Sequence, residues 1–200
     1  MTVPAALEPV SREERARRAG HRGAVVWITG LSGAGKTTLA LAAERALFDR
    51  GCGVFVLDGD KVRHGLCADL GFSIDDRSEN VRRIGEVARL FHEAGQIVLV
   101  SVISPLAADR ARARALVPAA DFIEVWCRCP LAVCEARDPK GLYRRARAGL
   151  LPEFTGISSP YEEPAAPDVL VDSSVSPVED EVRRLVAELE RRAIIAQPTR

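Results

Sequence analysis

Apolar and polar residues alternate along the chain in two different periods. Five short runs rich in Val, Ile and Leu are typical of strands buried on both faces of a sheet. Between these runs the apolar residues recur every three or four positions, which is the spacing of an amphipathic helix. The predicted strands span 24–29, 54–57, 97–102, 122–127 and 169–171. The predicted helices span 11–18, 39–50, 61–67, 76–94, 106–116 and 130–137, and a last helix opens at 176–179.

Strands that alternate with helices predict an α/β fold. Parallel strands need a long crossover between them, and a helix is its usual form. We therefore expect three layers, a mainly parallel sheet of about five strands with helices on both faces. The length of 200 residues suits one domain with a sizeable core. Residues 1–200 are thus predicted to form a single domain, with loose tails at 1–10 and 197–200.

Three of the predicted helices carry capping signals at their starts. A Ser, Thr or Asp followed three positions later by Glu has the spacing of a capping box, in which each side chain binds the other's backbone N–H. The signals are Ser11 with Glu14, Asp76 with Glu79, and Ser176 and Pro177 with Glu179.

The charge and cysteine content narrow the class of function. Twenty-eight basic and 28 acidic residues cancel, which argues against a general nucleic-acid or membrane-surface binder. No apolar run approaches the length of a membrane span. The five cysteines are odd in number and lack paired C-x-x-C spacing, so neither a disulfide framework nor a zinc site is expected. Cys127 and Cys129 are predicted to be buried thiols, and a cytoplasmic location fits.

One stretch carries specific chemistry. Residues 30–38 read Gly-Leu-Ser-Gly-Ala-Gly-Lys-Thr-Thr and match the phosphate-binding pattern G-x-x-x-x-G-K-[ST]. The stretch lies between a predicted strand and a predicted helix, where backbone N–H groups and the helix dipole converge on an anion. Lys36 can reach the β- and γ-phosphates of a nucleotide, and Thr37 can ligate Mg²⁺. The alternative is a plain glycine-rich turn, which the flanking strand and helix disfavour.

Two carboxylates follow the next predicted strand. Asp58 and Asp60 flank Gly59 directly after that strand. Ligand groups in open α/β sheets gather beyond the carboxyl ends of the strands. Carboxylates there can hold a Mg²⁺ shell or accept a proton from an attacking hydroxyl. The alternative is a polar turn in which Asp60 caps a helix.

A basic segment stands out because the whole chain is neutral. Residues 137–147 hold five basic side chains and one acid, Asp138, with Gly141 and Gly149 as possible hinges. Together with the following loop, residues 137–157 are predicted to form a basic lid and a substrate loop over polyphosphate. The alternative is an exposed basic helix. Arg63 and Arg77 lie in irregular backbone near Asp60 and suit anion recognition, whereas Arg82 and Arg83 suit a solvated helix face.

A phosphate loop alone does not separate kinases, GTPases and motors. The chain has no N-K-x-D, which guanine-specific GTPases usually carry, and it is short for a motor. A compact domain with a basic lid suits phosphoryl transfer to a small molecule, because the lid can exclude water.

At this level the chain resembles the adenylyl-sulfate kinase family of P-loop kinases. The resembling blocks keep their order over about residues 11–190. They are Gly-His-Arg-Gly-Ala-Val-Val-Trp-Ile-Thr with the phosphate loop (20–38), Leu-Asp-Gly-Asp (57–60), Val-Arg-His-Gly-Leu (62–66), Asp-Leu-Gly-Phe (69–72), Arg-x-Glu-Asn-x-Arg-Arg-Ile-Gly-Glu-Val-Ala (77–88), Ile-Ser-Pro (103–105), Cys-Glu-Ala-Arg-Asp-Pro-Lys-Gly-Leu-Tyr (134–143), Arg-Ala-Arg-Ala-Gly (145–149) and Glu-Phe-Thr-Gly-Ile (153–157).

The resemblance implies a fold, a reaction and partners. The fold would be the three-layer fold of P-loop nucleoside triphosphate hydrolases with a basic lid. The reaction would be ATP-dependent phosphorylation of the 3′-hydroxyl of adenosine 5′-phosphosulfate (APS), with Mg²⁺ as the cofactor. The family also suggests a homodimer and an association with ATP sulfurylase, and no nucleic-acid or membrane partner.

The resemblance also implies a set of site residues. For ATP they are Gly30, Leu31, Ser32, Gly33, Ala34, Gly35, Lys36, Thr37, Thr38 and Arg137. For APS they are Arg63, Phe72, Arg77, Asn80, Ile103, Ser104, Lys140, Gly141, Leu142, Phe154, Thr155 and Gly156. For the metal they are Thr37, Asp58 and Asp60.

Within this set, the resemblance assigns particular roles. Asp60 would orient or deprotonate the acceptor hydroxyl, and Lys36 and Lys140 would stabilise the transferring phosphoryl. Arg137 would stack on the adenine of ATP. Phe72 and Phe154 would sandwich the adenine of APS, although lone aromatic residues would otherwise be expected to pack in a core.

Ser104 and two departures from the family pattern leave alternatives open. A phosphoserine intermediate has been considered for the family's Ile-Ser-Pro serine, but in-line transfer needs none, and we expect Ser104 to shape the acceptor pocket. Lys61 stands where Asn is usual and adds a charge beside Asp60, and Val102 stands where an aromatic residue is common. The alternatives are a related P-loop kinase with a different acceptor and a non-catalytic nucleotide-binding partner of a sulfurylase.

Overall fold

The structure, a computed structural model, describes residues 9–197, so most of the two expected tails lies outside the described residues. In chain order the elements are α1 (Arg12–Ala19), β1 (Ala24–Thr29), α2 (Lys36–Asp49), β2 (Val54–Asp58), α3 (Gly59–Arg63), α4 (Ile74–Glu93), β3 (Ile97–Ser101), α5 (Ala107–Arg114), the short 3₁₀ helix η1 (Ala119–Asp121), β4 (Phe122–Arg128), α6 (Leu131–Arg137), α7 (Leu142–Arg147), β5 (Val169–Asp172) and α8 (Val178–Arg191).

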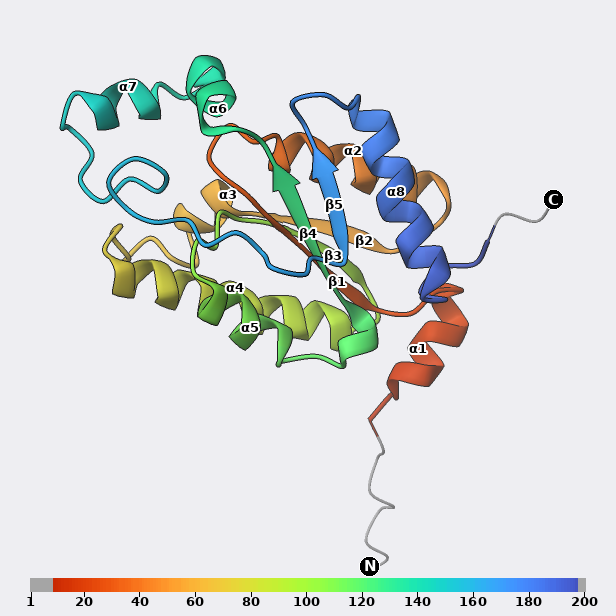
Figure 1. Cartoon of the computed structure of the whole chain (residues 1–200). Helices are drawn as coiled ribbons and strands as arrows, with labels where there is room; N and C mark the ends of the chain where they lie inside the picture. The colour runs from red at the N-terminus through yellow and green to blue at the C-terminus, as the bar shows by residue number, and fades with distance from the viewer. Residues whose placement is uncertain (1–8, 198–200) are drawn as a thin grey trace, which may run out of the picture.

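The strands form one five-stranded sheet in the order β2-β3-β1-β4-β5. Every neighbouring pair is parallel, which confirms the predicted α/β fold. All six residues of the central strand β1 are buried, as expected for a β-branched run covered on both faces. Because the strands are parallel, their carboxyl ends meet at one edge, where Figure 1 shows α6 and α7 beyond the arrowhead of β4.

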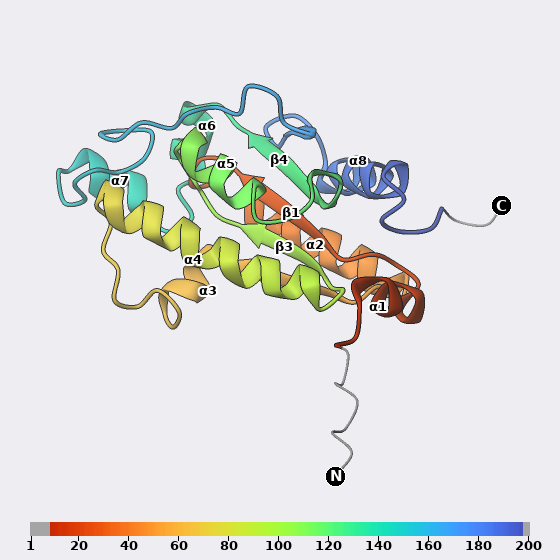
Figure 2. The ribbon, with the colours of Figure 1, turned by 90° about the horizontal axis from the view of Figure 1, so that it is seen from below.

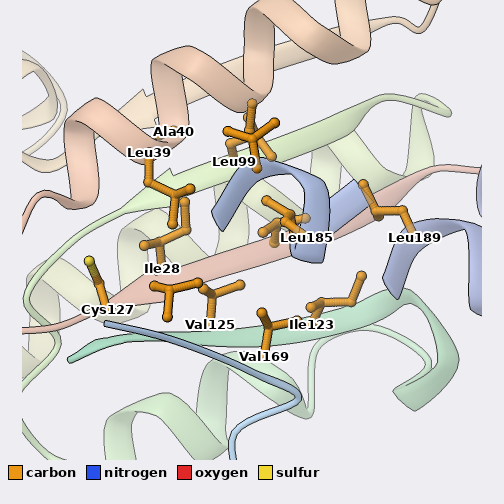
Figure 3. Packing of buried hydrophobic residues seen from close by; sticks show 14 of the residues in the cluster. Ile28, Leu39, Ala40, Leu99, Ile123, Val125, Cys127, Val169, Leu185 and Leu189 are labelled. Atoms are coloured by element: carbon orange, nitrogen blue, oxygen red, sulfur yellow. The ribbon is translucent and has the colours of Figure 1, made fainter. Parts of the chain in front are cut away.

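Helices cover both faces of the sheet. Figures 1 and 2 show α2 and α8 on one face and α4 and α5 on the other. On the first face, Ile28, Leu99 and Val125 of the sheet meet Leu39 and Leu185 of the two helices (Figure 3). Each of these residues is at most 1% exposed. Burial of such a side chain contributes about 1.5–3 kcal/mol, so the layers are held mainly by apolar packing.

The second face has its own apolar cluster. Trp27 and Val100 of the sheet pack with Ile84 of α4 and Ala113 of α5. The rings of Trp27 and Phe122 stack with centroids 6.1 Å apart. This cluster also contacts the segment after β3, because the indole N–H of Trp27 donates to the hydroxyl of Ser104.

Only one of the three capping signals is correct as predicted. At α1, Ser11 and Glu14 form the full capping box. At α4, however, the N-cap is Ser73, and the hydroxyl of Ser73 accepts from the backbone N–H of Asp76 at 3.1 Å. Asp76 is therefore the third residue of the helix and accepts from the Ser73 hydroxyl at 2.8 Å. The expected start at 76 was wrong because a better cap lies one turn upstream.

Two other helix starts also differ from the predictions. At α8 no side chain caps the helix, and Pro177 is the N-cap. Acidic residues in the first turn, Glu179, Asp180 and Glu181, complement the helix dipole there instead. The helix expected over 61–67 begins earlier, at Gly59, because the Asp58 side chain caps it.

A side chain of α2 reaches the outer edge of the sheet. Glu44 accepts through Oε1 from the backbone N–H of Val56 at 3.1 Å. Val56 lies in β2, which is an edge strand. This bond ties α2 to the strand that carries Asp58 at its end.

The prediction that Cys127 and Cys129 are buried thiols is confirmed. All five cysteines are free and buried. Burial raises the pKa of the Cys127 thiol to about 12, so this group is an apolar packing element rather than a thiolate nucleophile. Among residues 9–197, no helix is long and apolar enough to cross a membrane.

Candidate active site

The phosphate loop joins β1 to α2 at the carboxyl edge of the sheet. A Cβ on Gly30 would lie 2.5 Å from the carbonyl oxygen of Cys127, so only glycine fits between the loop and β4. Gly35 is the N-cap of α2 at φ 87°, a left-handed conformation that favours glycine, and no side chain caps the helix. The first N–H groups of this 14-residue helix are thus left for an anion.

Lys36 lies buried in the first turn of α2. Its Nζ donates to the carbonyl oxygen of Leu31 at 2.8 Å, which curls the side chain back over the loop. Burial lowers the pKa of Lys36 to about 8. Among the other charged groups, Lys140 adds to that lowering, whereas the Asp60 carboxylate opposes it. The ammonium is therefore poorly compensated in the free protein and would gain from a phosphate.

Thr37 and Asp58 meet beside the loop. The Thr37 hydroxyl donates to Oδ2 of Asp58 at 2.8 Å and lies 3.3 Å from the hydroxyl of Ser101. The other oxygen of Asp58 accepts from the backbone N–H of Asp60 at 3.0 Å. Asp58 therefore caps α3, and the alternative in which Asp60 is the cap was wrong.

Asp60 is left free for another role and pairs with Lys140. The Lys140 ammonium donates to Oδ2 of Asp60. Both side chains are more than half exposed, at 63% for Asp60 and 52% for Lys140. The pair therefore joins the predicted base to the predicted lid at an open position above the sheet edge.

The segment that carries Lys140 is anchored on the phosphate loop. The hydroxyl of Tyr143, which is buried in α7, donates to the carbonyl oxygen of Ser32 at 2.9 Å. Asp138 accepts from the backbone N–H groups of Tyr143 and Arg144 and so holds the start of α7. Gly141 lies between them at φ 64°. Lys140 is thus presented by a short turn with fixed ends.

Arg137 links the phosphate loop to the end of β5. One of its guanidinium nitrogens donates to the carbonyl oxygen of Gly33 at 3.3 Å and to the Ser173 hydroxyl at 3.2 Å. The other donates to the Ser173 carbonyl oxygen at 2.6 Å. Ser173 also lies against Gly35, since a Cβ on that glycine would be 3.5 Å from the Cβ of Ser173. The segment after β5 is therefore a wall of the loop.

Arg77 brings together two segments of the predicted acceptor side. Its Nε donates to the carbonyl oxygen of Phe72 at 2.8 Å. Its two terminal nitrogens donate to the hydroxyl of Thr155 and the carbonyl oxygen of Glu153. The segments that carry Phe72 and Phe154 therefore share one guanidinium.

The two predicted aromatic residues lie in different surroundings. Phe72 is 63% exposed and has the guanidinium of Arg63 4.4 Å from its ring centroid. Phe154 is partly buried and packs edge-on against Tyr143, with centroids 5.1 Å apart. Phe154 is thus held against α7, whereas Phe72 is open to solvent on most of its surface.

Gly156 and Asn80, two further predicted residues, lie in different surroundings. Gly156 borders a hollow of about 450 Å³ together with Leu31 and Ile157. Asn80 of α4 is buried, and its Oδ1 has no hydrogen-bond partner among the described residues. A buried amide oxygen without a partner costs about 1–3 kcal/mol, so a donor from a bound molecule would be favourable there.

The turn after β3 is held from two sides. The Thr29 hydroxyl donates to the carbonyl oxygen of Ile103 at 2.6 Å. The indole N–H of Trp27 donates to the hydroxyl of Ser104 at 3.0 Å. Ser104 is 2% exposed and adopts φ 41°, which is strained for a residue other than glycine.

The remaining predicted residues occupy simpler positions. Thr38 is exposed in the first turn of α2, Ala34 is buried beneath the loop, and Leu142 opens α7. The sequence did not indicate Trp27, Tyr143, Tyr161 or Ser173, because each acts through a contact distant in the chain. The Tyr161 hydroxyl lies 3.1 Å from that of Thr29. Only the aromatic character of Trp27 and Tyr161, each with a polar atom to satisfy when buried, could have signalled them.

Comparison with known proteins gives consistent matches over this region. A family model described as adenylylsulphate kinase matches residues 22–172. The adenylyl-sulfate kinase of Geotalea uraniireducens (strain Rf4) is 60% identical over 176 residues, which cover 88% of this chain and 85% of that protein. The adenylyl-sulfate kinase of Acaryochloris marina (strain MBIC 11017) is 55% identical over 190 residues, which cover 95% of this chain and 92% of that protein.

Solved structures agree with the sequence matches. The structure of the Mycobacterium tuberculosis APS kinase CysC in complex with AMPPNP and APS superposes with a TM-score of 0.82 at 50% identity. The superposition covers 85% of this chain and 99% of that one. The residues matched by the family model include every predicted site residue from Gly30 to Gly156.

Proposed function

The chain belongs to the adenylylsulphate kinase family, and we propose that Asp60 is the base of its reaction. The chain has adenylyl-sulfate kinase activity: it transfers a phosphoryl group from ATP to APS and gives 3′-phosphoadenosine 5′-phosphosulfate. The observation that carries the residue assignment is the meeting of Asp60 and Lys140 beside the phosphate loop.

Asp60 is suited to act on the acceptor hydroxyl. The 3′-oxygen of APS forms a bond to the γ-phosphorus, the bond from that phosphorus to the β,γ-bridging oxygen breaks, and ADP leaves. The hydroxyl proton passes to the Asp60 carboxylate. Asp58 is less suited to this role, because its oxygens already accept from Thr37 and from the start of α3.

The phosphate loop supplies the donor half of the site. The uncapped N–H groups of α2 and the ammonium of Lys36 hold the β- and γ-phosphates of ATP. Arg137 lies beside the loop, where it binds Ser173, and its guanidinium is proposed to stack on the adenine of ATP. Lys140 neutralises charge on the transferring phosphoryl when the phosphate replaces Asp60 as its partner.

The residues present fit a Mg²⁺ ion bound mainly by phosphate and water. Mg²⁺ takes oxygen ligands, keeps several waters and uses one or two protein ligands in kinase sites. Thr37 and Asp58 offer a hydroxyl and a carboxylate at one place, and Asp60 adds a second carboxylate nearby. No group of three or more His, Cys, Asp or Glu side chains that could hold a metal ion occurs among the described residues. Bound Mg²⁺ would supply charge neutralisation at the phosphates.

The acceptor half lies between the turn after β3 and the lid. Arg63, Arg77 and Asn80 are proposed to bind the phosphosulfate and ribose, and Phe72 and Phe154 to hold the adenine. The shared guanidinium of Arg77 supports a single pocket for these groups. Ile103, Ser104, Gly141, Leu142, Thr155 and Gly156 complete the proposed wall.

We assign Ser104 to the shape of this wall and not to a phosphoserine. Its hydroxyl is buried and accepts the Trp27 indole N–H. In-line transfer from ATP to the acceptor also needs no intermediate. Ser104→Ala should therefore retain turnover at saturating APS, although loss of the bond from Trp27 should raise its KM for APS. In the parent protein, mass spectrometry should detect no phosphate on Ser104 during turnover.

An acceptor panel tests the proposed site. The protein is incubated with ATP, Mg²⁺ and each of APS, adenosine, AMP and gluconate, and product is quantified by chromatography. APS should be the best acceptor, and EDTA should abolish turnover. A better acceptor among the others would contradict the proposed pocket and would point to Lys61 and Val102 as the residues that changed it.

Three further expectations remain proposals. A homodimer should give twice the mass of 21.7 kDa in light scattering after size-exclusion chromatography. An association with ATP sulfurylase should appear as co-elution of the two purified enzymes. A cytoplasmic location should appear as recovery in the cytoplasmic fraction of the source cells.

A further inference from the structure

One buried arginine stands behind the acceptor side of the site. Arg110 of α5 is 4% exposed and makes four hydrogen bonds through its guanidinium. One nitrogen donates to the carbonyl oxygens of Ser104 and Pro105 at 2.8 and 3.3 Å. A second donates to the carbonyl oxygen of Glu162 at 2.7 Å. Arg110 thus binds the backbone of two segments that are far apart in the chain.

The same two segments also bind each other directly. The backbone N–H of Glu162 donates to the carbonyl oxygen of Pro105 at 2.8 Å. The Glu162 carboxylate accepts from the backbone N–H of Ala107 at 2.6 Å. Arg110 therefore closes a joint between the turn after β3 and the loop that leads from Phe154 and Thr155 toward β5.

The charge of Arg110 has its own partner. Its Nε donates to Oε1 of Glu124 in β4 at 2.9 Å. Glu124 also pairs with Arg114, and Asp168 accepts from the Arg114 guanidinium and from the backbone N–H of Glu124. A buried ion pair is weak evidence for net stabilisation, so the pair with Glu124 does not by itself explain why Arg110 is buried. The bonds of Arg110 to the carbonyl oxygens point to a second role.

Arg110 holds a strained backbone at Ser104. A residue other than glycine at positive φ persists only where its surroundings hold it there. The surroundings here are Trp27, which holds the Ser104 hydroxyl, and Arg110, which holds its carbonyl oxygen. Loss of either contact would let the turn relax away from the pocket.

We propose that Arg110 is a positioning residue for the acceptor, which holds the Ser104 turn and the Phe154 loop at their spacing without touching APS itself. This inference rests on the proposed function of the acceptor pocket. It predicts an effect of Arg110 on the acceptor side, because none of its hydrogen bonds reaches the phosphate loop.

The substitution Arg110→Lys tests the proposal while the charge is kept. A lysine can still pair with Glu124, but as a point charge it cannot reproduce the fork that spans three carbonyl oxygens. The variant should fold and should raise the KM for APS about tenfold, a factor that corresponds to about 1.4 kcal/mol. The KM for ATP should stay unchanged, and kcat should change less than the KM for APS.

Arg112→Lys is the matched control on the same helix. Arg112 is 61% exposed, and within residues 9–197 its one ion pair is with Asp109, so its substitution should change neither KM. An equal rise of both KM values in Arg110→Lys, or an unchanged KM for APS in the folded variant, would overturn the proposal. Arg110→Ala is less informative, because it leaves Glu124 without this partner and is expected to unfold more easily.

A spectroscopic readout separates this inference from the proposed function. The chain has two tryptophans, so Trp126→Phe leaves Trp27 as the single tryptophan, which can be excited selectively at wavelengths that the tyrosines do not absorb. In this background Arg110→Lys should shift the emission of Trp27, because its indole partner Ser104 moves, and Arg112→Lys should not. An unchanged Trp27 emission would show that Arg110 does not hold the turn, whatever the acceptor of the enzyme proves to be.

Discussion

Lys140 and Asp60 form an ion pair although 80 positions separate them in the chain. The pair draws the turn before α7 to the start of α3, next to the buried Lys36. For Asp60 we propose a role at the acceptor hydroxyl, and for Lys140 a role at the transferring phosphoryl. Substitution of each partner, with turnover and stability measured separately, can distinguish a structural role of this pair from a catalytic one.

Replacement of Lys140 by Met should slow the reaction without unfolding the protein. Both partners are more than half exposed, so the pair should contribute at most about 1 kcal/mol to the free energy of unfolding. Loss of one preorganised charge at the transferring group should lower kcat by about a hundredfold. Thermal unfolding and steady-state rates measure the two effects.

Arg147→Gln is the control for this substitution. Arg147 lies on α7 and forms a comparable surface pair with Glu135. Its loss should change neither stability nor kcat appreciably. If Lys140→Met and Arg147→Gln behave alike in turnover, Lys140 has no role in the chemistry.

Replacement of Asp60 by Asn should remove the proposed base and keep the binding sites. General base catalysis contributes about 10²–10⁴-fold, so kcat should fall by a factor in that range while calorimetry shows ATP binding within a few-fold of the parent. Asp75→Asn, an exposed acid in the first turn of α4, should leave turnover unchanged. Turnover close to that of the parent in Asp60→Asn would assign the base elsewhere.

Nucleotide binding should take up a proton above about pH 8. The pKa of Lys36 is lowered from 10.5 to about 8 by burial, so the free protein loses this proton as the pH rises through 8. Phosphate favours the charged ammonium and restores it. Calorimetry at about pH 9 in buffers of different ionisation enthalpy should report the uptake. Lys36→Met should abolish it, and uptake that persists in this variant would exclude Lys36 as its source.

The lowered pKa of Lys36 also makes the free energy of unfolding depend on pH. Between pH 8 and 10.5 the unfolded chain keeps the Lys36 proton that the folded chain has lost. Unfolding then takes up a proton, so this residue makes the free energy of unfolding increase as the pH rises through that window. The difference between the parent and Lys36→Met, measured by denaturant titration, should show this slope.

Substitutions of Phe72 and Phe154 should both weaken APS binding but should differ in their effect on Tm. Phe72 is largely exposed, so Phe72→Ala should weaken APS binding by loss of stacking, which is about 1–3 kcal/mol per base, and should leave Tm nearly unchanged. Phe154→Ala should also lower Tm, because its ring packs against Tyr143. Calorimetry and thermal unfolding measure both quantities. A large fall in Tm for Phe72→Ala would contradict its exposed role.

The sequence was informative wherever the chemistry is local. The strand at 24–29 has the observed bounds of β1 because glycines close its apolar run on both sides. The phosphate loop could be predicted because its glycines, Lys36 and Thr37 lie within nine residues of one another. The α4 start was missed because Ser73 and Asp76 both suit a cap, and only the backbone geometry separates them.

Long-range contacts were the part that the sequence could not supply. Asp60 and Lys140 were each predicted for the site, but their direct pairing depends on how α7 packs on the loop. Arg110 was not singled out because arginines at 110, 112 and 114 look alike in the sequence. Only the buried position of Arg110 beneath the Ser104 turn distinguishes it from its neighbours.

The bond from Glu44 to Val56 bears on how the molecule meets other chains. An edge strand with unpaired N–H groups is a template on which a foreign strand can add, and from there aggregates grow. The N–H of Val56 is already engaged by a carboxylate of the same chain. A strand that paired with β2 at this point would have to break the bond from Val56 to Glu44 and would meet the negative charge of Glu44. Glu44→Ala should therefore make the protein more prone to precipitate on storage or gentle heating, with its catalytic residues untouched.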